Sequence, residues 1–405
     1  MKNLLLILLL AISICSCKEK IEPAEQIIDT YTAVKDSLTL AIDSTYQQGA
    51  IVGFSVAIVT KDTTLYNKGF GHANVSENKA YTSQTIQNIG SVSKTFIGIS
   101  LLKAQEMGKL NLDDPINKYL SFKVVNPNHP KVPITIRQLT SHTSSINDTD
   151  WYGKSYIMQE KEHTSNVVIP DYFSGPESSI SLTDYLKKVL TPNGEWYEPE
   201  IFALYKPGAK YHYSNIGAAV AAMVIEGATE ISFDTFTEEH IFKPMGMTAT
   251  GWFNKDIDIT NRSNAFKTKD TLIANYRLIT YPDGGLITST DNLSKYLSEL
   301  MKGYAGVGTL LNKESYQEFF KKQLVGSHFE DEKLDINKGI FLSYSKYGIG
   351  HSGGDPGIVT FMFFNPETSI GKIVFINTDS DDNPQLRQAF GKVWKTLTAY
   401  ENKLN

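Results

Sequence analysis

A serine and a lysine three residues apart, Ser91 and Lys94, are the side chains in this sequence best suited to chemistry. A serine hydroxyl is a weak nucleophile until a base takes its proton. Lysine can act as that base when burial or a neighbouring cation lowers its pKa. Residues three apart on a helix lie on one face, so this spacing brings the amine to the hydroxyl. The pair predicts a nucleophilic serine and its base.

The spacing alone does not select Ser91, because a serine followed three residues later by a lysine occurs five times in the chain. Of these serines only Ser91 follows a glycine, Gly90, and opens a long helical pattern, SVSKTFIGISLLKAQEMGKL. Its hydroxyl would then lie at the positive end of the helix dipole. The other pairs lie inside that helix or in turns and strand edges: Ser76/Lys79, Ser100/Lys103, Ser343/Lys346 and Ser369/Lys372.

The elements that must position this pair are indicated by apolar periodicity. Helical spacing marks residues 22–48 and 383–402. Short β-branched or aromatic runs typical of strands are residues 51–59, 64–70, 357–364 and 372–377. Strands near both ends of the chain predict one sheet built from distant segments. We therefore expect an α/β fold in which residues 23–80 and 280–405 form a discontinuous α/β lobe.

Residues 81–279 are mostly helical or irregular and are expected to form a second, helical lobe, with the site in the cleft between the lobes. An inserted loop region at about 147–205 contains one predicted helix, residues 182–190. Its aromatic side chains could line a substrate groove or simply pack the insert, and the sequence leaves both open. They are Trp151, Tyr152, Tyr156, Tyr172, Phe173, Trp196 and Tyr197.

The segment around Ser91, residues 87–96, resembles the active-site segment of the β-lactamase-related serine hydrolases. This group holds class C β-lactamases, DD-peptidases, D-aminopeptidases and esterases. Further landmarks of the family are matched in order at residues 108–115, 134–144, 207–215, 244–248, 284–286 and 351–353. The resemblance covers roughly residues 35–400 and departs from the family pattern at Ser145, where glycine is usual. It implies a β-lactamase/transpeptidase-like fold, with an antiparallel sheet flanked by N- and C-terminal helices and a mostly helical lobe.

The resemblance also implies roles for individual residues. Ser91 would attack a carbonyl carbon and become acylated, with Lys94 and Tyr213 sharing the general-base and general-acid steps. Asn215 would bind the substrate amide and orient Lys94. The backbone N–H groups of Ser91 and Gly354 would form the oxyanion hole.

His351, Ser352 and Gly353 occupy the position of the family's third motif, just before the strand predicted at 357–364, and are expected to bind substrate. Many family members have lysine where this chain has His351, and histidine carries a charge only at mildly acid pH unless its surroundings shift its pKa. We therefore rank a cell-envelope peptidase or esterase, of DD-peptidase or D-aminopeptidase type, above a β-lactamase. A non-catalytic binding or sensor module on the same scaffold is the third alternative. His142, in the 134–144 landmark, is assigned to structural support of the helical lobe.

The N-terminus resembles a bacterial lipoprotein signal. A cationic start and a short apolar run precede Ser16 and Cys17, so residues 1–16 are the expected signal peptide, Cys17 the lipidated residue and residues 17–22 a tether. We expect a membrane-anchored lipoprotein of the cell envelope. The net charge of -5 argues against a nucleic-acid partner. No cluster of histidine and cysteine has metal-ligand spacing, so we expect no metal or other cofactor, and the expected partner is a small-molecule or peptide substrate.

Overall fold

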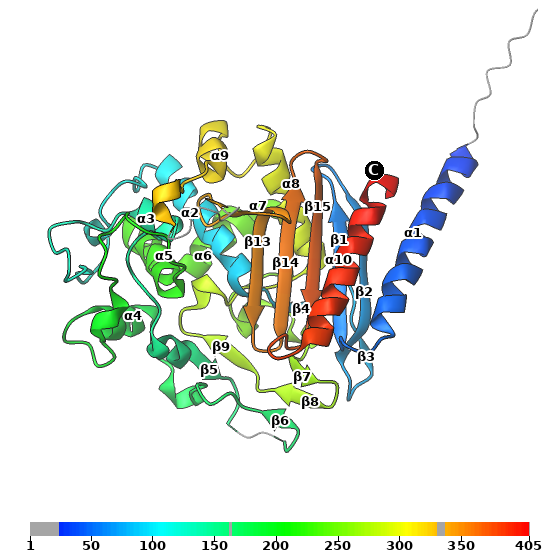
Figure 1. Cartoon of the computed structure of the whole chain (residues 1–405), viewed down its shortest axis with the longest axis horizontal. Coiled ribbons are helices and arrows are strands. Elements are labelled where there is room, and N and C mark those ends of the chain that lie inside the picture. The colour runs from blue at the N-terminus through cyan, green and yellow to red at the C-terminus, as the bar shows by residue number, and fades with distance from the viewer. Residues whose placement is uncertain (1–23, 162–163, 330–336, 405) are drawn as a thin grey trace, which may run out of the picture.

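The computed structural model describes residues 24–161, 164–329 and 337–404, and it shows an eight-stranded antiparallel sheet with helices on both faces (Figure 1). The strand order is β11-β12-β13-β14-β15-β1-β2-β3. The strands are β1 Gly53–Val59, β2 Thr64–Asn74, β3 Lys79–Ala80, β11 Asn337–Lys338, β12 Ser343–Ser345, β13 Gly348–Asp355, β14 Ile358–Asn365 and β15 Ile370–Ile376. This architecture confirms the predicted fold class.

Strands from the two ends of the chain are neighbours because β1 pairs with β15, with Phe54 opposite Ile376. Every residue of both strands is buried. Their β-branched and aromatic residues favour strands covered on both faces. The strand predictions at 51–59, 64–70, 357–364 and 372–377 are thereby confirmed.

The sequence prediction missed β13, although it placed residues 351–353 correctly before the strand that is β14. These residues lie inside β13, and His351 is opposite Met362 of β14. Four glycines in GIGHSGGD lower the β-propensity of this segment. Pairing with both β12 and β14 holds it extended instead. Tertiary hydrogen bonding therefore overrides local preference here.

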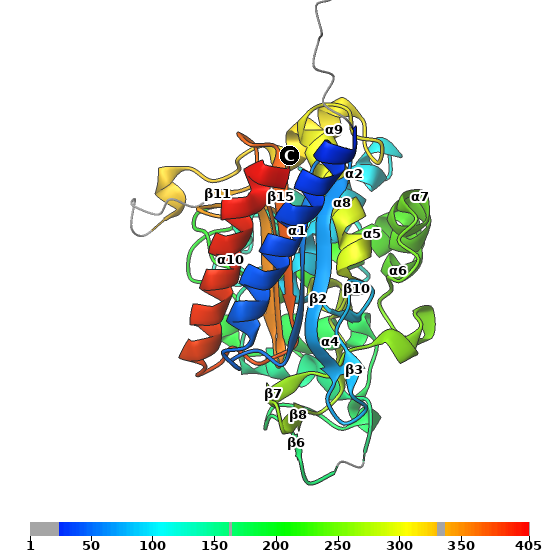
Figure 2. The same ribbon diagram turned by 90° about the vertical axis from the view of Figure 1, so that its right-hand side faces the viewer.

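The two terminal helices, α1 Ala24–Tyr46 and α10 Pro384–Leu404, lie side by side on one face of the sheet (Figure 2). Both were predicted from helical spacing. Leu38 and Ile42 of α1 and Leu397 of α10 belong to the buried cluster beneath them. This layer covers the face of the sheet that is remote from Ser91.

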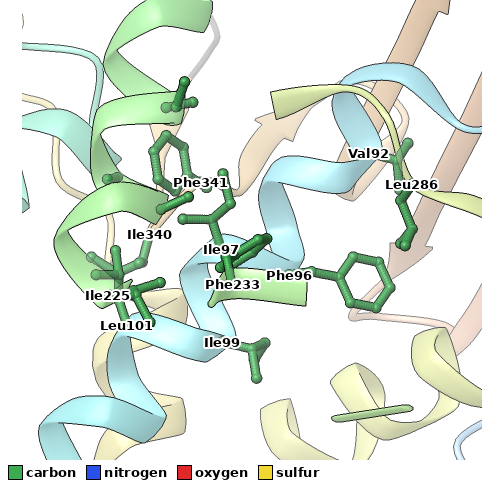
Figure 3. Close-up of a cluster of buried hydrophobic side chains, with 14 of the residues drawn as sticks. Val92, Phe96, Ile97, Ile99, Leu101, Ile225, Phe233, Leu286, Ile340 and Phe341 are labelled. Carbon is green, nitrogen blue, oxygen red and sulfur yellow. The ribbon is translucent and has the colours of Figure 1, made fainter. Parts of the chain in front are cut away.

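The opposite face is covered by α8 Thr290–Tyr304, which packs on β1, β2, β14 and β15. Helix α2 Lys94–Glu106 and helix α9 Lys313–Phe320 pack against each other, and α9 also packs on α8. Helix α2 lies in the middle of the molecule, and Figure 3 shows its Phe96, Ile97 and Leu101 among side chains from other elements. The Phe96 ring stacks on Tyr296 of α8 at a centroid distance of 3.9 Å. Residues 94–102 and Ala104 of α2 are buried, so the helix provides a rigid base for the residues at its start.

The helical lobe includes α3 Ile136–Thr140, α4 Leu182–Leu190, α5 Asn215–Thr229, α6 Phe233–Thr237 and α7 Lys243–Met245. The helix predicted at 182–190 is confirmed. Small sheets pair β4 Ile86–Asn88 with β10 Ile287–Ser289, β5 Tyr156–Met158 with β9 Tyr276–Leu278, and β8 Thr271–Ile273 with β6 Val167–Val168 and β7 Phe266–Thr268. Strands β5 and β6 thus tie the 147–205 insert to residues 266–278. The division into lobes near residues 80 and 280 stays a prediction.

Within the described ranges, no single helix is long and apolar enough to cross a membrane. Helix α5 together with residues 233–245 reaches that length and composition, but the pair is bent by 83°. Most of α5 is buried in the protein core.

Candidate active site

Ser91 lies in a 3-10 turn, Gly90–Ser93, that leads directly into α2. Gly90 has a φ of 53°, and a Cβ there would stand 3.0 Å from the amide nitrogen of Gly354. A Cβ on Gly353 would lie 2.9 Å from the amide nitrogen of Ser91. Only glycine allows the two chain segments to approach so closely. The backbone N–H groups of Ser91 and Gly354, predicted to form the oxyanion hole, therefore belong to adjoining segments.

The side chain of Lys94 is fully buried and makes three hydrogen bonds. Its Nζ donates to Ser91 Oγ at 2.9 Å, to Asn215 Oδ1 at 2.7 Å and to the backbone oxygen of Asp283 at 2.7 Å. An ammonium has three N–H donors, so all of them are matched. The predicted contact between Ser91 and Lys94 is present. The hydrogen bond from Lys94 to Asn215 adds Asn215 to the same cluster.

The charge state of Lys94 differs from the sequence expectation. Burial lowers its pKa, but the acidic groups of Tyr213, Asp283 and Asp148 raise it, and the pKa ends above its ordinary value. The resting site therefore holds an ammonium that orients the Ser91 hydroxyl, and this ammonium has no lone pair to accept the serine proton. The expectation of a lysine with a lowered pKa was wrong, because the sequence does not reveal which acidic groups surround it.

Asn215 is oriented by Asp148, a residue that the sequence reasoning missed. Asn215 is the first residue of α5, and Ser214 caps this helix. Asp148 Oδ2 accepts hydrogen bonds from the Asn215 backbone nitrogen and from Asn215 Nδ2, both at 2.9 Å. Its Oδ1 accepts from Ser214 Oγ at 3.1 Å and from the backbone nitrogen of Ile216 at 2.9 Å. Because Nδ2 is held by the carboxylate, Oδ1 of Asn215 must face Lys94.

The ring of Tyr213 lies at the centre of the site. Its centroid is 5.2 Å from Lys94 Nζ, 4.3 Å from the ring of His142 and 6.4 Å from the ring of His351. His142 Nδ1 accepts a hydrogen bond from the backbone nitrogen of Ser214 at 3.2 Å. Burial lowers the pKa of His142 well below its usual range, so the ring is neutral. His142 therefore packs directly against Tyr213. Its position is closer to the site than the sequence analysis indicated.

His351 is also neutral. Burial and the nearby charges of Lys338 and Lys94 lower its pKa to about 3. Its Nδ1 lies 2.6 Å from the backbone oxygen of Ser352, the geometry of an Nδ1–H donor. The side chains of His351 and Ser352 lie on opposite faces of β13, because side chains alternate along a strand. Its contact with substrate stays a prediction.

The structure adds a cation that the sequence reasoning missed. Lys338 of β11 is 8% exposed, and its Nζ lies 5.8 Å from the centroid of the Tyr213 ring. The sequence offered no signal for it, because residue 338 belongs to none of the matched motifs. We ranked antibiotic hydrolysis low because residue 351 lacks a permanent charge, and Lys338 weakens that reasoning.

Two carboxyl groups near the nucleophile, those of the buried Asp283 and the half-buried Asp355, each accept a hydrogen bond from the insert. Tyr152 donates to Asp283 Oδ1 at 3.0 Å, and Tyr156 donates to Asp355 Oδ1 at 2.6 Å. A Cβ on Gly90 would stand 3.2 Å from Asp355 Oδ2. Burial raises the pKa of Asp283 to about 7 and that of Asp355 to about 6. The insert therefore reaches the site through two of its aromatic residues.

Most other aromatic residues of the insert pack on one another. Trp151 stacks on Trp196 at a centroid distance of 5.5 Å, and Phe173 stacks on Tyr156 at 5.5 Å. Tyr172 meets the Phe173 ring edge-on. The sequence left open whether these aromatic residues line the site or pack the insert. Most of them pack the insert, whereas Tyr152 and Tyr156 also contact the carboxyl groups of the site.

The geometry around Ser91 can be compared with that of known proteins. The model of the beta-lactamase family matches residues 25–391. The chain belongs to this family, and its nucleophile arrangement is that of a serine hydrolase. Protein flp of Staphylococcus aureus (strain COL) is 24% identical over 380 residues, which are 90% of this chain and 69% of that protein.

Solved structures share the fold at low sequence identity. The D-amino acid amidase of Ochrobactrum anthropi SV3 superposes with a TM-score of 0.66 at 19% identity, over 89% of this chain and 99% of the amidase. A class C beta-lactamase gives a TM-score of 0.66 at 18% identity, over 91% of this chain and 97% of its own. At these identities the superpositions show the fold, and the choice of substrate depends on the residues of this chain.

Proposed function

We propose that the protein is an acyl-serine hydrolase of amide or ester bonds, most similar in action to a DD-peptidase or D-aminopeptidase of the cell envelope. The observation that carries the proposal is the hydrogen bond from Lys94 Nζ to Ser91 Oγ, with Asn215 Oδ1 on the same ammonium. A binding module without catalysis would not need this arrangement. The D-amino acid amidase with the same fold supports amide bonds as the target.

The proposed reaction proceeds through an acyl-enzyme. Because Lys94 rests as an ammonium, the pair formed by Lys94 and Tyr213 first releases one proton to solvent. Ser91 Oγ then attacks the substrate carbonyl carbon while its own proton passes into that pair. The backbone N–H groups of Ser91 and Gly354 stabilise the negative charge that develops on the carbonyl oxygen. The same pair then protonates the leaving amine or alcohol. Water attacks the ester on Ser91 by the reverse sequence of proton transfers, which releases the acid and restores the hydroxyl.

The first experiment tests the nucleophile. A fluorophosphonate should label the protein at one residue per chain, and Ser91→Ala should abolish the label, because Ser91 is the proposed nucleophile and its hydroxyl accepts a hydrogen bond from the fully buried Lys94. Ser100→Ala is the matched control, since Ser100 also precedes a lysine by three residues on α2 and should keep full labelling. Labelling that survives Ser91→Ala would refute the proposal.

The second experiment tests the substrate. Peptides that end in D-alanine, D-amino acid amides and a chromogenic cephalosporin are offered to the wild-type protein and to Ser91→Ala. Turnover of peptides or amides with only a single acylation by the cephalosporin supports the peptidase assignment. Repeated cephalosporin turnover favours the alternative, a β-lactamase, which Lys338 supports because it places a cation beside Tyr213.

We further propose that the protein is a lipoprotein anchored to a membrane of the cell envelope through Cys17, which lies outside the described residues. Cells fed with radiolabelled palmitate should incorporate the label into the wild-type protein. Cys17→Ala should remove it, whereas Cys15→Ala should keep it, because Ser16 is the small residue required before the modified cysteine. Equal labelling of both variants would contradict the assignment.

A further inference from the structure

Lys338 brings into the site a positive charge that the reaction above does not use. It is the last residue of β11, and its Nζ donates a hydrogen bond of 2.7 Å to Ser343 Oγ on the adjacent strand. Among the described residues, no carboxylate lies within 4.0 Å of this ammonium. By contrast, the buried Lys372 is paired with Glu401. Within the part of the chain that the structure describes, Lys338 is therefore a nearly buried cation without an opposite charge at ion-pair distance.

A buried ammonium without a counter-ion is costly, because it has lost most of its water. Burial and the charge of Lys94 lower the pKa of Lys338 to about 8. The rings of Tyr211 and Tyr213, 5.7 and 5.8 Å from Nζ, offset part of this cost by cation–π attraction. Neutral rings and one hydroxyl do not supply a negative charge. The environment is thus suited to an anion that arrives with the ligand.

The position of Lys338 relates that anion to the reacting bond. The ammonium groups of Lys338 and Lys94 face the same ring, that of Tyr213. Lys94 in turn contacts the nucleophile. Ser343 Oγ accepts from Lys338 and keeps its own hydrogen, so an N–H and an O–H donor lie together. Two adjacent donors match the two oxygens of one carboxylate.

We propose that Lys338, assisted by Ser343, binds a free carboxylate of the substrate. The preferred substrates are then amides or esters that carry a carboxylate close to the scissile bond, as a peptide does at its C-terminal residue. This inference rests on the proposed function and narrows it to carboxylate-bearing substrates. Neutral His351 cannot perform this role by charge.

The test is a competition assay that does not depend on turnover. An N-acetylated D-Ala-D-Ala dipeptide with a free carboxylate, and the same dipeptide as its C-terminal carboxamide, compete with a fluorophosphonate for Ser91. The free acid should protect wild-type Ser91 at a concentration about 10- to 100-fold lower than the carboxamide, the range expected for a charge-assisted pair. Lys338→Met should remove this preference by weakening protection by the free acid alone.

Two further variants separate binding from structural effects. Lys338→Arg keeps the cation and should keep the preference. Lys346→Met removes an exposed lysine from the turn between β12 and β13 and should change nothing. Removing an unpaired buried charge should not lower the thermal midpoint, so the Lys338→Met protein is expected to be folded. Labelling without any competitor confirms an intact nucleophile in each variant.

The pH dependence provides a signature that a packing role would not produce. The ammonium is charged below its pKa, so the preference for the free acid should decline as pH rises through about 8 and persist in Lys338→Arg. The groups that face Lys338 are Lys94, His142, Tyr211, Tyr213, Ser343 and His351. Of these, the two histidines have pKa values far below this range and stay neutral.

Each result decides the inference. Equal protection by the two dipeptides in the wild-type protein overturns it, and so does an absence of protection by both. A loss of protection by both compounds in Lys338→Met assigns Lys338 to the support of Tyr213 and also overturns it. Hydrolysis of the dipeptide is measured separately. A protein that binds the free acid through Lys338 but does not hydrolyse it refutes the proposed function and leaves the binding site standing.

Discussion

Replacing Asp148 by asparagine tests how the nucleophile is held in place, because the substitution keeps the shape of the side chain. Both carboxylate oxygens accept two hydrogen bonds each, from groups at the start of α5. An asparagine has only one acceptor oxygen, and its NH2 group is a donor. Whichever way the amide is turned, that NH2 group faces a backbone N–H.

The expected cost follows from this mismatch. One buried backbone N–H loses its acceptor, at about 1–3 kcal/mol, and the negative charge at a helix N-terminus is lost, at about 0.5–1 kcal/mol. The free energy of unfolding should therefore fall by about 2–4 kcal/mol. Activity should fall as well, because the Asn215 amide can now turn its NH2 group toward Lys94. Losing an acceptor for that ammonium should lower kcat/KM about 10- to 100-fold.

Urea unfolding followed by circular dichroism measures the first quantity, and ester hydrolysis under conditions where the variant is fully folded measures the second. Asp258→Asn is the matched control. Asp258 accepts hydrogen bonds from Thr260 and Asn261 in an exposed turn, and the change should leave the urea midpoint and the activity as in the wild type. A folded Asp148→Asn protein with wild-type kcat/KM would refute the claim that Asp148 orients Asn215.

Three other substitutions probe the buried charges and the close approach at Gly90. The pKa of Asp283 is raised to about 7, so the folded state binds one more proton than the unfolded state between about pH 4 and pH 7, and stability falls as pH rises through this window. In urea unfolding at pH 8, Asp283→Asn should therefore have a free energy of unfolding about 1–3 kcal/mol higher than the wild type, and this difference should disappear at pH 4. Glu401→Ala should lower the free energy of unfolding by about 3–5 kcal/mol, because Lys372 is left buried without its partner, and equilibrium urea titration would show a smaller loss if that pair were solvated. Gly90→Ala should reduce kcat about tenfold or more in a steady-state ester assay, since its Cβ would press on the Gly354 nitrogen, and unchanged kcat would mean that this nitrogen does not stabilise the oxyanion.

The sequence was sufficient for elements whose own side chains specify them. The run at 51–59 is β-branched and apolar on both faces, so its own side chains specify a buried strand. In α1, α4 and α10 the apolar residues recur at helical spacing, so these segments form helices that bury one face. The strand β13 could not be found in this way. Its Gly353 is required by the close approach of β13 to the turn at Gly90 and Ser91, which is a property of two segments more than 250 residues apart in the chain.

The sequence by itself determined the family and the reacting pair, because the order of motifs and the position of Ser91 at the start of a long helical pattern are local properties of the chain. Only the tertiary structure decided the charges around that pair. Lys94 is an ammonium with a raised pKa, His351 is neutral and Lys338 supplies a cation beside Tyr213. A pKa depends on burial and on neighbours in space, and those neighbours come from β11, β13, α5 and the insert. Sequence order does not show which of them meet.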